Sequence, residues 1–180
     1  MRVGVGRGGF GAVLCGLVVA PVLLAGCGSG AGPGPAAAPA ADAPMVAEPG
    51  PFLQMCGGVS DEEFLRLTTL PAGMSSFHNL VGCSWDDMAG GGHGSLSWYR
   101  GSPIEREHTI VDTTGRVVQA ISIAGHDGYE GRTSDGTLCE VGISLGDDFY
   151  VWSLVLPPAL GVDTCGVARQ LATMTLERAQ

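Results

Sequence analysis

Cys27 is the residue whose thiol is best placed for covalent chemistry. It ends the run Leu24-Ala25-Gly26-Cys27, which has the pattern of a bacterial lipobox. In such a run the thiolate is the nucleophile that accepts a diacylglyceryl group, and the cysteine becomes the mature N-terminus. The two small residues before it fit the sites of the processing enzymes. We therefore predict an anchor of acyl chains such as palmitate, in which each buried methylene contributes about 0.8 kcal/mol.

The residues before Cys27 have the properties of an export signal. Arg2 and Arg7 form a short positive leader, and residues 10–25 carry no charge. A proline interrupts this apolar run, whose length suits a signal peptide and is marginal for a permanent membrane span. The alternative is an ordinary secretory signal that leaves Cys27 as a loop thiol. We predict a lipoprotein signal peptide over residues 1–26.

Four further cysteines of the exported part could form disulfides: Cys56, Cys83, Cys139 and Cys165. An even number of cysteines in an oxidising compartment favours pairing. The sequence leaves three connectivities open, and we favour Cys56 with Cys83 and Cys139 with Cys165, because each pair brackets one helix-and-strand unit. A metal site is the competing interpretation. Neither a C-x-x-C motif nor a suitably spaced histidine accompanies these cysteines, so we expect no metal and no cofactor.

Ser144 lies in the run Gly142-Ile143-Ser144-Leu145-Gly146, which matches the G-x-S-x-G pattern of a hydrolase nucleophile elbow. That elbow requires a sharp turn from a strand into a helix. Here the serine lies within an alternating strand that leads into a hairpin, and this setting favours a structural serine. Hydrolase chemistry at Ser144 is therefore the alternative and not the leading interpretation.

Histidines and loop acids offer two weaker candidates. The histidines fall on different predicted elements with neither H-x-x-x-H nor H-E-x-x-H spacing, so we expect solvated or hydrogen-bonded side chains at His78, His93, His108 and His126. One segment holds three acids that could chelate Ca²⁺ but lack the EF-hand order: Asp127, Glu130 and Asp135. A turn rich in glycine and aspartate is the favoured explanation for that segment.

Composition separates a tether from a folded domain. Residues 28–51 are mostly glycine, alanine and proline, a composition that cannot form a core. We predict the lipidated cysteine and its tether over residues 27–51 and one globular α+β domain over residues 52–180. The net charge of −9 becomes −11 when the two leader arginines are removed. Such a balance disfavours nucleic acid and anionic headgroups as partners.

Capping signals predict three helices in this domain. Ser60 and Glu63 form a capping box that begins a helix over residues 61–69, and the acids of its first turn complement the helix dipole. The run Ser102-Pro103-Ile104-Glu105 predicts a second capping box with proline at the first helical position. Asp163 is the expected N-cap of a last helix.

Alternating apolar residues predict five strands, over residues 77–86, 96–99, 117–124, 137–145 and 149–156. Residues 125–136, which are rich in glycine and acids, predict a loop. The resulting order is helix, two strands, helix, three strands, helix. We predict the α+β class, with an antiparallel sheet of about five strands, helices packed on one face, and two disulfides.

The setting of the cysteines resembles a known family. A cysteine lies just before the first helix, Cys83-Ser84-Trp85 lies in the first strand, Cys139 lies in a late strand and Cys165 opens the last helix. This arrangement resembles actinobacterial envelope lipoproteins of unknown function, typified by the mycobacterial lipoproteins LprB and LprC. The resemblance covers residues 56–180. It implies an envelope location and disulfides, and it carries over no settled activity and no catalytic residues.

No constellation of residues in the sequence assigns a molecular activity. The leading hypothesis is a non-enzymatic binding module, held by its lipid anchor on the extracytoplasmic face of the cell membrane, that binds an envelope protein or a small apolar ligand. The alternatives are an envelope hydrolase that uses Ser144 and a purely structural surface lipoprotein. A pocket that holds Ser144, a histidine and a carboxylate within hydrogen-bond reach would favour the hydrolase.

Overall fold

A computed structural model describes residues 49–180 of the chain. The predicted signal peptide, Cys27 and the tether up to residue 48 lie outside the described residues. The described helices are η1 (Met55–Gly58), α1 (Asp61–Thr68), α2 (Ile104–Thr113), η2 (Pro158–Leu160) and α3 (Thr164–Arg178).

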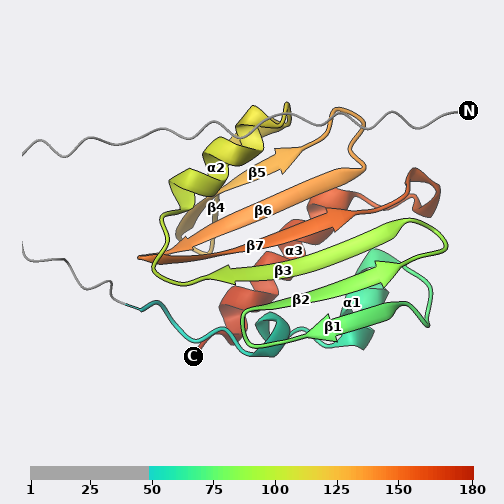
Figure 1. The fold of residues 1–180 in the computed structure, drawn as a ribbon, viewed down its shortest axis with the longest axis horizontal. Coiled ribbons are helices and arrows are strands. Elements are labelled where there is room, and N and C mark those ends of the chain that lie inside the picture. The colour runs from blue at the N-terminus through green and yellow to red at the C-terminus, as the bar shows by residue number, and fades with distance from the viewer. Residues whose placement is uncertain (1–48) are drawn as a thin grey trace, which may run out of the picture. The chain divides into compact units, whose positions relative to one another are not determined.

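One antiparallel sheet organises the described part of the chain (Figure 1). Its order is β1-β2-β3-β7-β6-β5-β4, so β3 and β7 lie side by side although they are far apart in the sequence. The seven strands are β1 (Ser75–His78), β2 (Gly82–Asp87), β3 (Gly92–Tyr99), β4 (Val117–Ile123), β5 (His126–Arg132), β6 (Leu138–Leu145) and β7 (Asp148–Val155). The α+β class is confirmed, and the expectation of about five strands is wrong.

Two predicted segments account for the extra strands. The strand predicted over residues 77–86 is a hairpin, because Asn79 turns the chain back. Its backbone N–H donates to the Gly82 carbonyl (2.9 Å), and its side-chain oxygen accepts from the Val81 N–H (2.9 Å). The loop predicted over residues 125–136 contains β5, which pairs with both β4 and β6.

The first predicted capping box is present at the start of α1. Ser60 Oγ accepts from the Glu63 backbone N–H (3.2 Å), and Glu63 Oε2 accepts from the Ser60 N–H (3.0 Å). Arg178, at the end of α3, also donates to both oxygens of Glu63 (2.8 and 2.9 Å). The cap therefore serves two purposes, because it begins α1 and ties α1 to α3.

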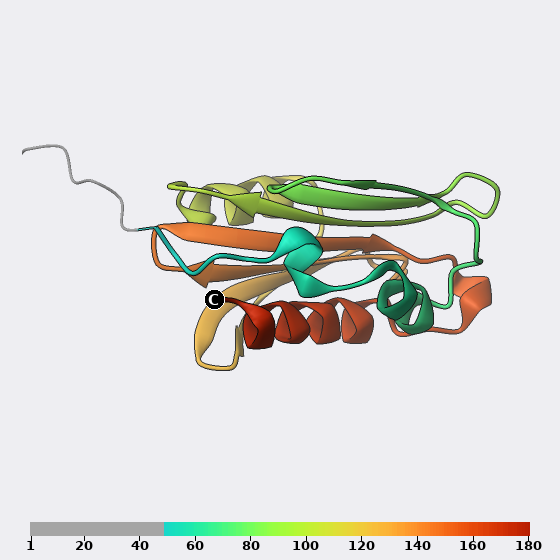
Figure 2. The same cartoon turned by 90° about the horizontal axis from the view of Figure 1, so that it is seen from below.

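Helices α1 and α3 cover the same side of the sheet, which we call the first face; α3 lies along β6 and β7 (Figure 2). Of the 26 buried hydrophobic residues within residues 49–180, 22 form one cluster here. Three rings stack within it: the Phe64 centroid lies 4.2 Å from that of Trp85 and 6.2 Å from that of Trp152. Both disulfides lie within this cluster.

Helix α2 lies on the opposite side of the sheet, the second face, so the expectation that all helices pack on one face is wrong (Figures 1 and 2). The one fully buried residue of α2 is Val111, and a Cβ at Gly131 of β5 would lie 2.4 Å from it. The preceding strand residue, Glu130, binds Arg169 of α3. Successive strand residues point to opposite sides, so the two helices are separated by the sheet.

The second predicted capping box does not form. Pro103 occupies the N-cap position of α2, and no side chain caps the helix. The side chain of Glu105 lines a cleft beside α2 and does not reach back to Ser102. Since an N-cap hydrogen bond typically contributes about 1 kcal/mol, α2 lacks a stabilising feature that α1 has.

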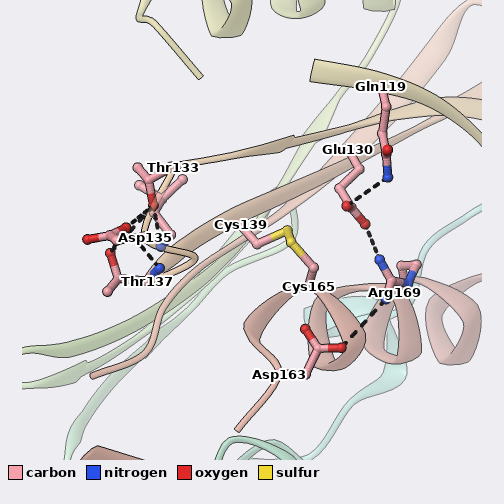
Figure 3. Close-up of a disulfide and its surroundings, with 10 residues drawn as sticks. Gln119, Glu130, Thr133, Asp135, Thr137, Cys139, Asp163, Cys165 and Arg169 are labelled. Carbon is pink, nitrogen blue, oxygen red and sulfur yellow. Dashed lines mark hydrogen bonds and ion pairs between the residues drawn. A yellow bond between two sulfur atoms is a disulfide. The ribbon is translucent and has the colours of Figure 1, made fainter. Parts of the chain in front are cut away.

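Two disulfides join elements of the first face. One connects Cys56 of η1 to Cys83 of β2, and the other connects Cys139 of β6 to Cys165 of α3 (Figure 3). This is the pairing that the sequence analysis favoured.

The packed part of the chain begins before residue 52. The Gly50 N–H donates to Asp148 Oδ2 (3.0 Å), and Phe52 and Gln180 exchange two backbone hydrogen bonds. The division of tether from domain at residue 52 stays a prediction, and a shortened chain should begin at residue 49 to keep the Asp148 contact. Within residues 49–180, no helix is both long enough and apolar enough to span a membrane.

Candidate functional site

A cleft between α2 and the second face brings several predicted candidates together. Its volume is about 330 Å³, at the lower end of the range of about 300 to 1,000 Å³ typical of small-ligand pockets. Helix α2 lies over β4, β5 and β6 in Figure 1, and the lining comes from these elements. The lining residues are Ile104, Glu105, His108, Ala120, Asp127, Gly128, Tyr129 and Ser144.

The repeat of the helix and the alternation of the strands place these side chains around the cleft. Ile104 and His108 are four residues apart on α2, so they lie one above the other on the side that faces the sheet. Asp127 and Tyr129 are two residues apart on β5 and therefore share the second face. Ser144 comes from the same face of β6, two residues beyond Gly142, with which Tyr129 is paired.

Tyr129 supplies the most buried part of the lining. The residue is only 2% exposed, and its ring lies so close to Gly142 that a Cβ there would be 2.4 Å away. Its hydroxyl is buried and has no hydrogen-bond partner among the described residues. Burial, and to a smaller degree the nearby carboxylate of Glu140, raises the pKa of this phenol well above its ordinary value. Tyr129 is therefore a neutral phenol whose hydrogen-bonding capacity is unused.

An unused buried hydroxyl is costly. Leaving such a group without a partner typically costs about 1 to 3 kcal/mol. The ring of His108 lies 5.5 Å from the Tyr129 ring, tilted by 44°. The lining thus combines two rings with an unsatisfied hydroxyl, which is the kind of surface that a partly polar organic ligand can occupy.

Ser144 and His108 line the same cleft, together with the carboxylates of Glu105 and Asp127. No hydrogen bond joins Ser144 to the histidine or to either carboxylate within the described residues. Ser144 also pairs with Phe149 in the β6–β7 ladder, so it lies in a regular strand and not at a strand-to-helix turn. A serine, a histidine and two carboxylates therefore line one cleft, but within the described part of the chain the serine lacks the hydrogen bond to a base that would activate it as a nucleophile.

Two of the other histidines, His78 and His93, are paired with acids of other elements, and His126 begins β5 beside Asp127. His78 Nε2 is 3.0 Å from Asp61 Oδ1, an oxygen that also accepts from Trp85 Nε1 (2.7 Å). His93 Nδ1 is 2.7 Å from Asp86 Oδ1. These contacts match the expectation of hydrogen-bonded histidines. They also give Asp61 a role beyond the helix dipole, because it fixes the orientation of the buried Trp85 ring.

The three acids proposed as Ca²⁺ ligands do not meet. Asp127 lines the cleft on the second face, whereas Glu130 is buried on the first face, where it accepts from Gln119 and Arg169 (Figure 3). Asp135 accepts hydrogen bonds within the turn that follows β5, from Thr133 and Thr137. The prediction that a turn explains Asp135 is confirmed, and the strand β5 separates the other two acids.

One group of metal-ligand atoms lies close together elsewhere in residues 49–180. The ligand atoms of Glu130, Cys139 and Cys165 fall within 4.8 Å of one another. The two sulfur atoms are bonded to each other, so neither is a thiolate that could bind a metal ion. The carboxylate is already paired with Arg169 (Figure 3). This cluster is a disulfide beside a buried ion pair.

A second cleft is larger but contains, among the described residues, no buried polar group that lacks a partner. It has a volume of about 440 Å³ and lies between the segment before β1 and the turn after β2, lined by residues such as Met74, Asp86 and Met88. Within residues 49–180, no buried side chain without a hydrogen-bond partner belongs to it. The cleft beside α2 is therefore the stronger candidate site.

Sequence reasoning missed two buried polar residues that shape the domain. Tyr129 lies in β5, within the segment 125–136 for which the sequence predicts a loop. Asp148 begins β7, just before the strand predicted over residues 149–156. Its carboxylate is 2% exposed, binds Arg100 Nε (2.7 Å) and accepts from the Gly101 N–H (2.8 Å) in addition to Gly50. No sequence pattern indicates these distant partners.

Sequence comparison assigns the chain to a family whose function is unknown. Residues 22–178 match the model of a family described as "Protein of unknown function (DUF3558)". The chain belongs to this family.

Named relatives are mycobacterial. The protein named "Putative lipoprotein LprB" of Mycobacterium bovis is 38% identical over 147 residues, which cover 77% of this chain and 78% of the relative. LprB of Mycobacterium tuberculosis gives the same values, and LprB of Mycobacterium leprae is 39% identical over 136 residues, 71% of each chain. The resemblance to this lipoprotein family is thus confirmed. No solved structure matches the chain.

Proposed function

We propose that this protein is a lipoprotein, anchored through Cys27 on the extracytoplasmic face of the membrane, whose folded domain is a non-enzymatic binding module. The lipobox, the even number of cysteines in the domain and the relatives named as lipoproteins support the anchor and the envelope location. The domain would act at the end of its tether. Its partner is a small ligand held in the cleft beside α2.

The cleft is the observation that carries this proposal. It has the volume of a small-ligand pocket, apolar and polar side chains contribute to its lining, and Tyr129 leaves a buried hydroxyl without a partner. In native proteins such unsatisfied groups are few and mark strain, function or a missing partner. A bound ligand with one polar group would satisfy the hydroxyl.

An envelope hydrolase is the second candidate, because Ser144, His108 and two carboxylates line the same cleft. The absence of a hydrogen bond between Ser144 and His108 argues against it, although such bonds tighten in some enzymes only when substrate binds. The strand geometry at Ser144 also differs from a nucleophile elbow, which exposes its serine on a strained turn. Binding without turnover therefore accounts for more of the site.

The anchor is tested by fractionation of cells that express Cys27→Ala. We expect the variant in the soluble extracytoplasmic fraction and the unmodified protein in the membrane fraction. Cys15→Ala, which changes a cysteine of the predicted signal peptide, is the matched control and should stay with the membrane. Membrane retention of Cys27→Ala to the level of the control would contradict the lipid anchor.

The binding module is tested by native mass spectrometry of the protein purified gently from its own envelope. We expect a mass increment from a non-covalent small ligand that disappears on denaturation. Esterase assays and labelling with a fluorophosphonate should give no signal above that of Ser144→Ala. Stoichiometric labelling that Ser144→Ala abolishes would favour the hydrolase, and neither increment nor labelling would favour a purely structural protein.

A further inference from the structure

We propose that the ligand of the cleft beside α2 is a small organic cation, an amine or quaternary ammonium carried on a short apolar body. The inference rests on the proposed function, that this cleft binds a ligand, and adds its chemical class. The charge of the lining, the spacing of its ligand atoms and its apolar side chains each support it.

The charge of the lining favours a cation. Glu105 comes from α2 and Asp127 from β5, so carboxylates reach the cleft from the helix and from the sheet. Within the described part of the chain no arginine lines the cleft, and the protein contains no lysine at all. Arg116, just after α2, is already paired with Glu140. The surrounding domain is itself acidic, and its field adds to the attraction for positive charge.

The spacing of the ligand atoms argues for an organic cation and against a metal ion. A divalent ion needs several oxygen or nitrogen atoms within about 2 to 2.6 Å of itself, and these atoms must therefore lie close to one another. Within residues 49–180, Glu105, His108 and Asp127 do not form such a group, since the one cluster with all ligand atoms within 4.8 Å is elsewhere. The carboxylates can instead contact one extended cation through separate atoms.

The rest of the lining suits the body of such a molecule. Ile104, which is half-buried, and Ala120, which is exposed, offer apolar contact, and Tyr129 is the buried member of the lining. The Tyr129 hydroxyl has no partner of its own. An ammonium group with N–H donors, or a polar group on the ligand body, can supply one. An anion could accept a hydrogen bond from the Tyr129 hydroxyl, but it would meet repulsion from the carboxylates of Glu105 and Asp127.

Three probes that share one aromatic ring and differ in charge test the inference. Benzylamine is cationic, benzyl alcohol is neutral and benzoate is anionic at pH 7. Each is titrated into the full chain carrying Cys27→Ala, with the amide resonances of residues 104–108, 127–129 and 144 as the readout. We expect benzylamine to shift these resonances with an affinity about threefold to thirtyfold higher than that of benzyl alcohol, as two exposed ion pairs allow. Benzoate should bind more weakly than either.

Matched variants separate the class of ligand from the presence of a site. Glu105→Gln with Asp127→Asn should lower the affinity for benzylamine to that for benzyl alcohol. Asp112→Asn, on the same helix but outside the cleft, should leave both affinities unchanged. If the double variant fails to fold, the three probes on the chain with both acids intact decide the question, together with the loss of benzylamine preference expected at high salt.

The outcomes distinguish the two proposals. Equal or tighter binding of benzyl alcohol or benzoate in the cleft would overturn the cation class and leave the cleft as a binding site. Shifts confined to residues outside the cleft, or no shift with any probe, would overturn the cation class. If, in addition, native mass spectrometry finds no co-purified ligand, the proposal of a binding module would itself be overturned.

Discussion

The two faces of the sheet are built differently. The first face carries 22 of the 26 buried hydrophobic residues, both disulfides, and ion pairs that join α3 to Glu63 and to Glu130. The second face carries α2, with one fully buried residue, no capping side chain and a cleft at its base. Its buried hydrophobic residues outside the main cluster are Val111, Tyr129, Phe149 and Val151.

This difference separates stability from binding. Disulfides and stacked rings on the first face can stabilise the fold, while the second face retains an unsatisfied hydroxyl and a helix with few buried contacts. Binding sites commonly use such less stable regions, because a ligand can then contribute the missing contacts. If the comparison is right, equivalent changes on the two faces will have unequal effects on the free energy of unfolding.

The largest difference is expected from truncating one side chain on each face. Phe64→Ala removes a fully buried ring from the stack with Trp85 and should lower the free energy of unfolding by about 3 to 5 kcal/mol. Ile104→Ala, at a half-buried position beside the cleft, should cost about 1 kcal/mol or less. Urea denaturation measures both. Comparable losses for the two variants would show that the second face is as important for the fold as the first.

Removal of a disulfide should have the next largest effect. Cys139 and Cys165 are 26 residues apart, and the chain-entropy model gives about 3 to 4 kcal/mol for a loop of this length. Replacing both by serine should therefore lower the urea midpoint strongly, while the Glu105→Gln, Asp127→Asn pair leaves it nearly unchanged. A disulfide-free domain with an unaltered midpoint would contradict the stabilising role given to the first face.

Two buried tyrosines give a matched pair with a smaller effect. The Tyr150 hydroxyl, on the first face, donates to the Ala172 carbonyl (2.8 Å), so Tyr150→Phe should cost about 1 to 2 kcal/mol. The Tyr129 hydroxyl has no partner, so Tyr129→Phe should be neutral or stabilising. Chemical denaturation of both variants provides the measurement. A loss at Tyr129 equal to that at Tyr150 would mean that its hydroxyl is satisfied in the free protein.

The smallest effect is a pH dependence confined to the first face. Hydrogen bonds from Arg178, and then from the Ser60 backbone, lower the pKa of Glu63 from 4.5 to about 2. A carboxyl whose pKa is lower in the folded state stabilises the fold above pH 4.5, and this contribution is lost as the pH falls towards 2. Thermal melts between pH 5 and 2 should therefore show a shallower decline for Glu63→Gln than for the unmodified chain.

Asp135 provides the control for that pH experiment. Hydrogen bonds from Thr133 first, and then from Thr137, also lower the pKa of Asp135, but this carboxyl is exposed in a turn of the sheet. Asp135→Asn should therefore change the pH dependence less than Glu63→Gln does. The opposite order would show that the turn and not the junction of α1 with α3 controls the acid sensitivity.

Local signals allowed much of the first face to be predicted. The Ser60 capping box needs only residues three positions apart, and it forms as expected. Alternation identified β6, because most of its apolar residues point to one buried side, and β7 was identified as an apolar run that returns from a short turn. The sequence left three disulfide connectivities open, and the one favoured because each pair brackets one helix-and-strand unit is the one that forms.

The second face could not be predicted in the same way. Whether α2 packs above or below the sheet depends on Gly131, which leaves room for Val111, and nothing in the helix itself specifies that partner. The glycines of β5 resembled loop residues, although Gly131 is where α2 approaches that strand. Gly142 of the neighbouring strand β6 is where the Tyr129 ring packs. The cleft depends on these tertiary approaches, and local periodicity does not indicate them, so even a correct strand prediction at Tyr129 would not have placed its ring in a cleft.

Native-state hydrogen exchange tests the contrast between the faces most directly. Amides of β6, β7 and α3 should exchange only through global unfolding, whereas amides of α2 should exchange through a local opening that costs at least about 2 kcal/mol less. Addition of a ligand that fills the cleft should then raise the protection of α2 selectively. Equal protection of α2 and α3 in the free protein would contradict the account, because α2 would then belong to the same cooperative unit as the disulfide-bonded face.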